Sequence, residues 1–210
     1  MRRVMILAVV LAVFALAGCS SFTTPTPDRS RFFALTSKAE ANGAANPIGF
    51  EQISLGVGPV RIPGYLDREE LVTRVAENRF DVSQNDRWIE PLEENVSRVL
   101  AQNLYTLLKT ERIVRYPWPS SRRVTHQVEV EVLRFEPNTS REAELSTRWV
   151  IVDTATKQSL ANKTSFIKRP VKSDSKETAV DALSEALADL SREIAGALRA
   201  VAQQKPAAQK

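Results

Sequence analysis

Residues 124–132 read Val-Thr-His-Gln-Val-Glu-Val-Glu-Val, a regular alternation in which His126 takes one of the apolar places. Successive residues of an extended chain point to opposite sides, so the valines and His126 share one face and the polar side chains share the other. Such a segment predicts a β-strand with one face in the core and one face in water. A sheet of this kind is covered on a single side.

Shorter stretches with strand character lie on both sides of this segment. Turn-forming residues at 77–78 and 153–157 indicate hairpins, and the sequence Glu-Pro-Asn-Thr at 136–139 is expected to end the central strand. Together these patterns predict a largely antiparallel, mixed sheet, with further strands at residues 31–35, 53–59, 71–75, 79–83, 113–116, 143–151 and 160–167.

Two segments change to helical periodicity. Residues 90–109 carry apolar side chains at intervals of three and four, and Pro91 suits a first helical turn because it lacks an N–H group. A second stripe runs from Val180 to Val201, after an Asp174-x-x-Glu177 start that resembles a capping box. Either stripe could pair with a coiled-coil partner, but packing on the sheet needs no partner. The predicted fold class is a two-layer α/β sandwich, a mostly antiparallel mixed sheet with two long amphipathic helices on one face.

The N-terminus has the form of a lipoprotein signal. Arg2 and Arg3 precede an unbroken apolar run over residues 4–17, which is shorter than the roughly 20 residues that span a bilayer. The run ends in Leu16-Ala17-Gly18-Cys19, a lipobox pattern. Small residues let the chain enter a protease cleft, cleavage falls between Gly18 and Cys19, and the Cys19 thiol accepts the lipid. An uncleaved anchor, or an ordinary signal peptide with a stray cysteine, is the alternative.

Four segments follow from these observations. Residues 1–18 are the predicted signal peptide, and residues 19–30, rich in Pro, Ser and Thr, are a lipid-anchored flexible tether. Residues 31–202 form one domain, and residues 203–210, which lack large apolar side chains, form a disordered tail.

The residue after the cysteine predicts which membrane holds the lipoprotein. In enterobacterial sorting an Asp at that place retains a lipoprotein in the inner membrane, and this chain has Ser20. The expected location is therefore the inner leaflet of the outer membrane, with the domain facing the periplasm.

The composition excludes several classes of protein. One Cys rules out an intramolecular disulfide framework, and one His rules out every two-His metal motif. Removing Arg2 and Arg3 from the 29 basic residues leaves 27 against 25 acidic ones. The remaining basic pairs, Arg122-Arg123 and Lys168-Arg169, lack interleaved aromatics, so we expect no nucleic-acid partner and a solvated role for both pairs.

Groups for catalysis are scarce. Gly56-x-Gly58 precedes Pro59 rather than a third glycine and a helix, so it does not predict a phosphate-binding loop. His126, on the apolar strand face, is expected to be a structural histidine, with a ligand or pH-sensing role left open. Glu129 and Glu131 are expected to be solvated rather than an acid–base pair. The sequence predicts no enzyme, no metal and no cofactor.

The segment Gly56–Arg74 is the most unusual. Pro59 and Pro63 stiffen a loop around the apolar pair Tyr65-Leu66, and a stiff loop can present an apolar contact at small entropic cost. The alternative is a crossover loop in which Tyr65 folds back on the core. The candidate partner contacts are Pro59, Pro63, Tyr65, Leu66, Arg68 and Arg74.

The same segment carries a family resemblance. Val57-Gly58-Pro59-Val60-Arg61-Ile62-Pro63-Gly64-Tyr65-Leu66-Asp67-Arg68, followed by Leu71-Val72-Thr73-Arg74, resembles the signature of the ABC-type transport auxiliary lipoproteins, a family that includes the lipoprotein of the paraquat-inducible Pqi system. Residues 31–35, 87–92 and 132–136 are similar to three further blocks. Glu69-Glu70 departs from the Pro-Gln that is more usual there, a change that could alter partner contacts.

The resemblance implies a non-catalytic outer-membrane lipoprotein that works with an MCE-domain protein anchored in the inner membrane. Such components are thought to move lipids between the two membranes, and the lipoprotein is expected to form a homo-oligomeric ring at the outer end. Two other functions stay open on the residues alone. One is a structural lipoprotein that assists outer-membrane assembly or regulates a cell-wall enzyme, and the other is a lipid-modifying enzyme centred on His126.

Overall fold

The computed structural model describes residues 29–40 and 53–204. The predictions for the signal peptide, for residues 19–28 of the tether with Cys19 and for residues 205–210 of the C-terminal tail lie outside the described residues. Residues 203–204, which were predicted to belong to the tail, are the end of helix α3 (Lys176–Gln204). The elements are β1 (Arg31–Phe33), β2 (Leu55–Arg61), β3 (Glu70–Ala76), β4 (Arg79–Trp88), α2 (Leu92–Leu108), β5 (Ile113–Arg115), β6 (His126–Pro137), β7 (Glu142–Asp153), β8 (Ser159–Pro170) and α3 (Lys176–Gln204).

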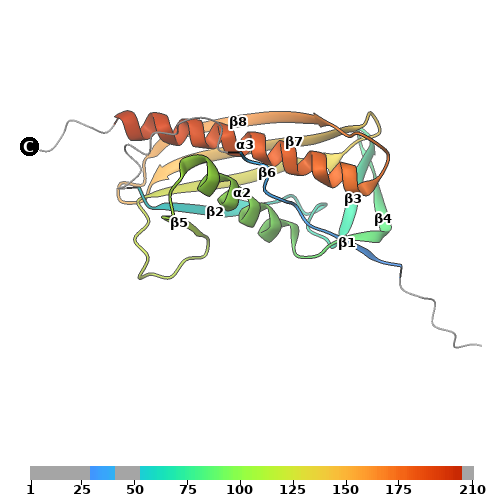
Figure 1. Ribbon diagram of the computed structural model, residues 1–210, viewed down its shortest axis with the longest axis horizontal. Coiled ribbons are helices and arrows are strands. Elements are labelled where there is room, and N and C mark those ends of the chain that lie inside the picture. Colours follow the sequence, from blue (N-terminus) through green and yellow to red (C-terminus); the bar gives the residue numbers. More distant parts are fainter. Residues whose placement is uncertain (1–28, 41–52, 205–210) are drawn as a thin grey trace, which may run out of the picture.

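The predicted fold class is confirmed. A five-stranded sheet has the order β5-β2-β6-β7-β8, with β2 parallel to both of its neighbours and β6, β7 and β8 antiparallel. Both helices lie on the same face of this sheet, α2 against β2 and β5 and α3 against β6, β7 and β8 (Figure 1). These elements form the sheet–helix body.

The core of the body follows the apolar periodicity of the sequence. His126, Val128, Val130 and Val132 are all buried on one face of β6. The α3 stripe is buried as well, with Leu187, Leu190, Ile194 and Leu198 fully inaccessible. The stripe therefore packs against other elements of the same chain, as predicted, and is not available to a coiled-coil partner.

Instead of one sheet, the strands form two. A three-stranded sheet has the order β1-β4-β3, with β1 parallel to β4 from Arg31↔Asp86 to Phe33↔Trp88. The hairpin of β3 and β4 turns at residues 77–78 as predicted, but β4 continues to Trp88, well beyond the expected end at residue 83. Residues 84–87 are polar and show no strand alternation. Asp86 and Arg87 are paired with β1, more than fifty residues earlier, and Arg87 is also paired with Glu70 of β3.

Strand β6 also runs past its predicted end. It continues through Glu136 to Pro137, and its register with β7 shifts between Val132 and Arg134. A bulge of this kind inserts one residue and redirects the side chains that follow it. As a result Phe135 and Glu136 are both buried, where strict alternation would expose one of them.

The small sheet lies against the end of β6. An isolated parallel bridge joins Arg74 to Asn138, and β3 contacts β6. In Figure 1, β1, β3 and β4 gather at one end of the molecule, while α3 finishes at the other. Within the residues described here, no helix is long and apolar enough to cross a membrane.

Candidate functional site

The four sequence blocks that carry the family resemblance meet at one end of the fold. They contribute β1, most of β3, the end of β4, the loop over residues 62–69 and the last residues of β6, while residues 57–61 of the longest block lie in β2. We call β1, β3, β4 and residues 62–69 the signature end.

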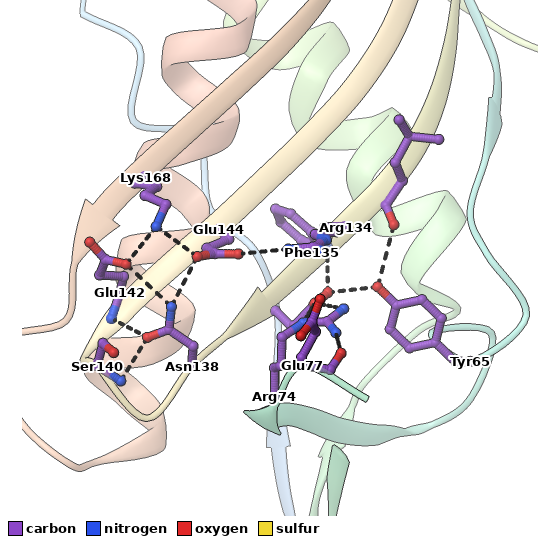
Figure 2. A network of polar contacts seen from close by, with 12 residues as sticks. Tyr65, Arg74, Glu77, Arg134, Phe135, Asn138, Ser140, Glu142, Glu144 and Lys168 are labelled. Carbon is purple, nitrogen blue, oxygen red and sulfur yellow. Dashed lines mark hydrogen bonds and ion pairs between the residues drawn. The ribbon is translucent and has the colours of Figure 1, made fainter. Parts of the chain in front are cut away.

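A buried carboxylate connects the signature end to the body. The Tyr65 hydroxyl donates to Glu136 Oε2 at 2.8 Å, and the Phe135 N–H donates to the same oxygen at 2.8 Å. Arg74 donates to Glu136 Oε1 from Nε at 2.8 Å and pairs with it through Nη2 at 2.6 Å. Figure 2 shows Tyr65 and Arg74 reaching the end of β6 from two different segments.

The burial of Glu136 makes these contacts obligatory. Its side chain is 1% exposed, and that of Arg74 is 13% exposed. A buried charge is tolerated only when it is paired and hydrogen-bonded. Burial, followed by the nearby charge of Glu136, raises the pKa of the Tyr65 hydroxyl far above its ordinary value. Tyr65 therefore remains protonated and acts as a donor. We call Tyr65, Arg74 and Glu136 the carboxylate lock.

Aromatic contacts complete the lock. The rings of Tyr65 and Phe80 lie 4.7 Å apart, and the guanidinium of Arg74 lies 4.4 Å from the Phe80 ring centre. A cation above an aromatic face is attracted by the ring quadrupole. Arg74 is thus held between a carboxylate and an aromatic ring.

The expectation of an exposed apolar tip at Tyr65-Leu66 is wrong. Leu66 is 3% exposed and belongs to the core, while Tyr65 is half-buried and bonded to Glu136. The alternative in which Tyr65 folds back on the core is the one the structure shows. A tight turn, closed by the Leu66 N–H on the Pro63 carbonyl at 2.9 Å, directs both side chains inward. Arg68 is the exposed member of the predicted contact set, at 42%.

The apolar surface of the signature end comes from residues that sequence reasoning did not select as contacts. Phe32 and Ile89 are 58% and 61% exposed. One signal was available, because adjacent Phe32 and Phe33 cannot share a face of a strand. Phe33 packs on the core, so Phe32 points away from it.

Phe32 and Ile89 line one hollow of about 290 Å³. Backbone bonds hold its walls, since the Ile89 N–H donates to the Phe33 carbonyl at 2.9 Å and the Trp88 N–H to the Glu69 carbonyl at 2.6 Å. We call this hollow the apolar groove, and its lining residues are Phe32, Asp67, Arg68, Glu69, Trp88, Ile89, Glu90, Pro91 and Leu92.

Paired charges surround the apolar groove. Each cation at its rim or beside it has a carboxylate partner, in the pairs Arg31–Asp86 at 2.6 Å, Arg68–Glu70 at 3.6 Å, Arg87–Glu69 at 3.2 Å and Arg98–Glu90 at 2.6 Å. The lining carries one further carboxylate, Asp67, so the rim has no excess of positive charge.

A second hollow of about 360 Å³ lies on the other side of the first turn of α2. Tyr116, 54% exposed, and Pro59 lie in its wall, and Pro59 is one of the predicted contacts. We call it the proline hollow, and it is lined by Pro59, Val60, Glu93, Glu94, Ser97, Arg115, Tyr116 and Pro117.

The glycines before Pro59 make room for the aromatic segment that follows β5. A Cβ atom on Gly56 would lie 2.6 Å from the Trp118 ring. Gly58 has φ +109°, and a Cβ atom there would lie 2.9 Å from Tyr116 Cβ. The Tyr116 and Trp118 rings meet edge to face at 5.6 Å. The Gly-x-Gly pattern thus serves packing.

The residues that were considered as catalytic candidates are either buried in the core or paired with a neighbouring side chain. His126 is 4% exposed, and its Nδ1 lies 2.9 Å from the Thr125 hydroxyl. Glu131 pairs with Arg148 at 3.4 Å on the solvent side of the sheet. In the part of the chain that the structure covers, no three His, Cys, Asp or Glu side chains are grouped to hold a metal ion.

The second basic pair of the sequence is engaged in ion pairs. Lys168 bridges Glu142 at 2.8 Å and Glu144 at 2.9 Å, near Asn138 in the β6–β7 turn (Figure 2). Arg169 pairs with Asp189 of α3 at 2.5 Å. These contacts fix the edge strand β8 to its neighbours.

Comparison with known proteins gives two results. The family model of the ABC-type transport auxiliary lipoprotein component matches residues 33–195. A solved structure from Xanthomonas campestris is similar with a TM-score of 0.71 and 17% identity, covering 83% of this chain and 98% of that one. Another, of an uncharacterized protein, has a TM-score of 0.63 and 19% identity, covering 80% and 98%. No curated protein matches the chain in sequence.

Proposed function

The chain belongs to the ABC-type transport auxiliary lipoprotein family, and on that premise we propose that it is the outer-membrane lipoprotein subunit of an MCE-type intermembrane lipid transport system. In this role it docks to an MCE-domain protein anchored in the inner membrane and carries out no chemistry itself. The family match over residues 33–195 is the observation that carries the proposal.

The anchor is the first part of the proposal. Cys19 becomes the first residue after cleavage at Gly18 and carries the acyl chains, and Ser20 directs the protein to the outer membrane. A lipoprotein family and the Leu-Ala-Gly-Cys pattern at residues 16–19 support this assignment. Mass spectrometry of the native protein should find acylated Cys19 at the N-terminus. An intact Met1, or Cys19 without acyl groups, would contradict it.

The non-catalytic role is supported by how the polar groups are used. The buried carboxylate of Glu136 is bound by Arg74 and Tyr65, and His126 is buried in β6 beside Thr125. A lipid-modifying enzyme centred on His126 would need that residue for activity. His126→Phe should therefore leave function in the cell unchanged.

Partner docking is assigned to the proline hollow and the adjoining loop. Pro59 and Tyr116 line the hollow. Pro63 and the exposed Arg68 lie in the loop over residues 62–69, which follows β2, the strand that carries Pro59. Rigid aromatic and proline side chains lose little entropy when a partner binds, which favours them as contacts. Tyr65, Leu66 and Arg74 support this surface from beneath.

Site-specific photocrosslinking tests the docking surface. A benzophenone amino acid replaces Tyr116, and in a matched control it replaces Tyr105, which is 49% exposed on α2. We expect crosslinks from position 116 to a coexpressed MCE-domain protein, and none from position 105. Equal crosslinking from both positions would contradict the surface, and failure of the unmodified chain to copurify with that protein would contradict the partner.

Assembly into a ring of identical subunits is the last part of the proposal. Its test is the mass of residues 19–210 in solution by sedimentation or light scattering. A closed oligomer supports the ring, and a monomer at all accessible concentrations contradicts it.

A further inference from the structure

We propose that the apolar groove is a membrane contact: Phe32 and Ile89 insert into the surface of the bilayer that holds the lipid anchor and orient the domain on it. The inference rests on the proposed anchor at Cys19. It adds a second point of attachment, made by the folded domain itself.

Two apolar side chains are presented together at this place. Phe32 and Ile89 are each more than half exposed and line the same hollow, on adjacent segments whose backbones are bonded to each other. Trp88 and Leu92 form the buried floor beneath them. The two side chains are therefore held outward by a rigid base, and they are not part of a mobile loop.

The length of the chain before β1 favours a bilayer as the occupant. Nine residues lie between Cys19 and Arg29, where the described chain begins, so a fully extended connection of ten residue steps reaches at most about 35 Å. Strand β1 starts two residues later, and Phe32 lies within it. An anchored chain thus holds the signature end near the lipid surface, while α3 finishes at the opposite end of the molecule (Figure 1).

Tethering makes a small contact effective. A short linker gives the second binding event an effective concentration on the order of millimolar, so a weak apolar contact is populated when the anchor is in place. Amphipathic surfaces bind the interface between headgroups and acyl chains by burying apolar area there. Phe32 and Ile89 supply that area.

The charges around the groove indicate which lipids it fits. Arg31, Arg68 and Arg87 are each paired with a carboxylate, so the rim offers no excess of positive charge to anionic headgroups. A rim without excess positive charge suits zwitterionic phospholipids. The contact should therefore be insensitive to salt and to the fraction of anionic lipid.

The test uses residues 19–210 coupled through Cys19 to a maleimide-headgroup lipid. Cys19 is the one cysteine of the chain, so the attachment is unique and does not depend on acylation in the cell. The vesicles contain phosphatidylcholine and phosphatidylethanolamine, with bromine on the acyl chains as a fluorescence quencher. The variants are Phe32→Trp and, as a matched control, Phe166→Trp, because Phe166 is even more exposed, at 78%, on β8.

The three native tryptophans set a background, so each variant is compared with the unsubstituted chain on the same vesicles. We expect the bromine atoms to quench the extra fluorescence of Phe32→Trp, and its emission to shift to the blue as the ring enters the acyl region, with neither change at position 166. Adding Ile89→Ser to the Phe32→Trp chain should reduce the quenching. Equal quenching at positions 32 and 166 would overturn the proposal. Quenching that requires anionic lipid and disappears in high salt would also overturn it, because it would assign the contact to charge.

A protein occupant is the competing outcome. If position 32 is not quenched on vesicles but a photocrosslinker there captures the MCE-domain protein, the groove is a protein-docking site and the membrane contact is wrong. Because the anchor is supplied chemically in this experiment, a negative result would contradict only the membrane contact. The native lipidation of Cys19 is tested separately by mass spectrometry.

Discussion

In the sheet–helix body, Leu187 and Leu190 are fully buried against the sheet, and their side chains have no polar atoms to satisfy. Where the signature end meets the body, Glu136 of β6 is buried as deeply and depends on every donor around it. Apolar packing is non-directional and tolerates changes that keep volume. A buried charge does not, because removing one partner leaves the other without compensation. The two regions should therefore respond differently to substitutions of similar size.

The largest effect should follow from opening the carboxylate lock. Arg74→Ala leaves Glu136 buried without its cation, and breaking such a pair costs about 3–5 kcal/mol of unfolding free energy. Urea denaturation followed by circular dichroism measures the change. The matched control is Arg148→Ala, which removes an exposed pair with Glu131 and should cost less than about 1 kcal/mol.

A double variant sharpens this result. Combining Arg74→Ala with Glu136→Gln removes both charges. The double variant should therefore lose less unfolding free energy than the sum of the losses in the two single variants. If Arg74→Ala costs no more than Arg148→Ala, the lock does not hold the signature end to the body.

Removing one donor from the lock should have a smaller effect. Tyr65→Phe keeps the ring against Phe80 but leaves Glu136 Oε2 with the Phe135 N–H alone as a close donor. Leaving a buried acceptor short of a partner costs about 1–3 kcal/mol. The same denaturation experiment on Tyr105→Phe, an exposed tyrosine on α2, should show a change near zero.

Alkaline pH should weaken the lock through Tyr65. Burial and the charge of Glu136 raise the pKa of Tyr65 in the folded chain above its ordinary value of 10.0. The stabilisation is therefore complete below pH 10 and declines as the pH rises above it, where the unfolded chain loses the proton first. Thermal melts between pH 8 and pH 11 should fall more steeply for the native chain than for Tyr65→Phe. Parallel curves would contradict the raised pKa.

The body could be predicted from the sequence because its signal is local. The alternation at 124–132 and the apolar stripe from Val180 to Val201 each predict which of their own residues are buried. The structure confirms both predictions. The hairpin at residues 77–78 was readable for the same reason, since its turn and both strands are adjacent in the chain.

The signature end could be predicted only in part because its determinants are distant in the sequence. The pairing of Arg31 with Asp86 extends β4 through polar residues that have no strand pattern of their own. The bulge after Val132 moves Glu136 into the interior, and the alternation of residues 124–132 does not predict this change of register. The inward turn of Leu66 and the outward position of Ile89 follow from these long-range contacts.

The smallest change in stability should come from a conservative substitution in the body. An equally conservative substitution in the carboxylate lock should cost more. Leu187→Met keeps volume and apolar character at a fully buried position of α3, and such exchanges cost less than about 1.5 kcal/mol. Arg74→Lys keeps the charge, but an ammonium group cannot reproduce the two guanidinium contacts to Glu136 Oε1 together with the contact on the Phe80 ring. Urea midpoints of the two variants should therefore differ, with Arg74→Lys the less stable. Equal midpoints would mean that Arg74 acts only through its positive charge, and that the geometry of its guanidinium group adds no stability.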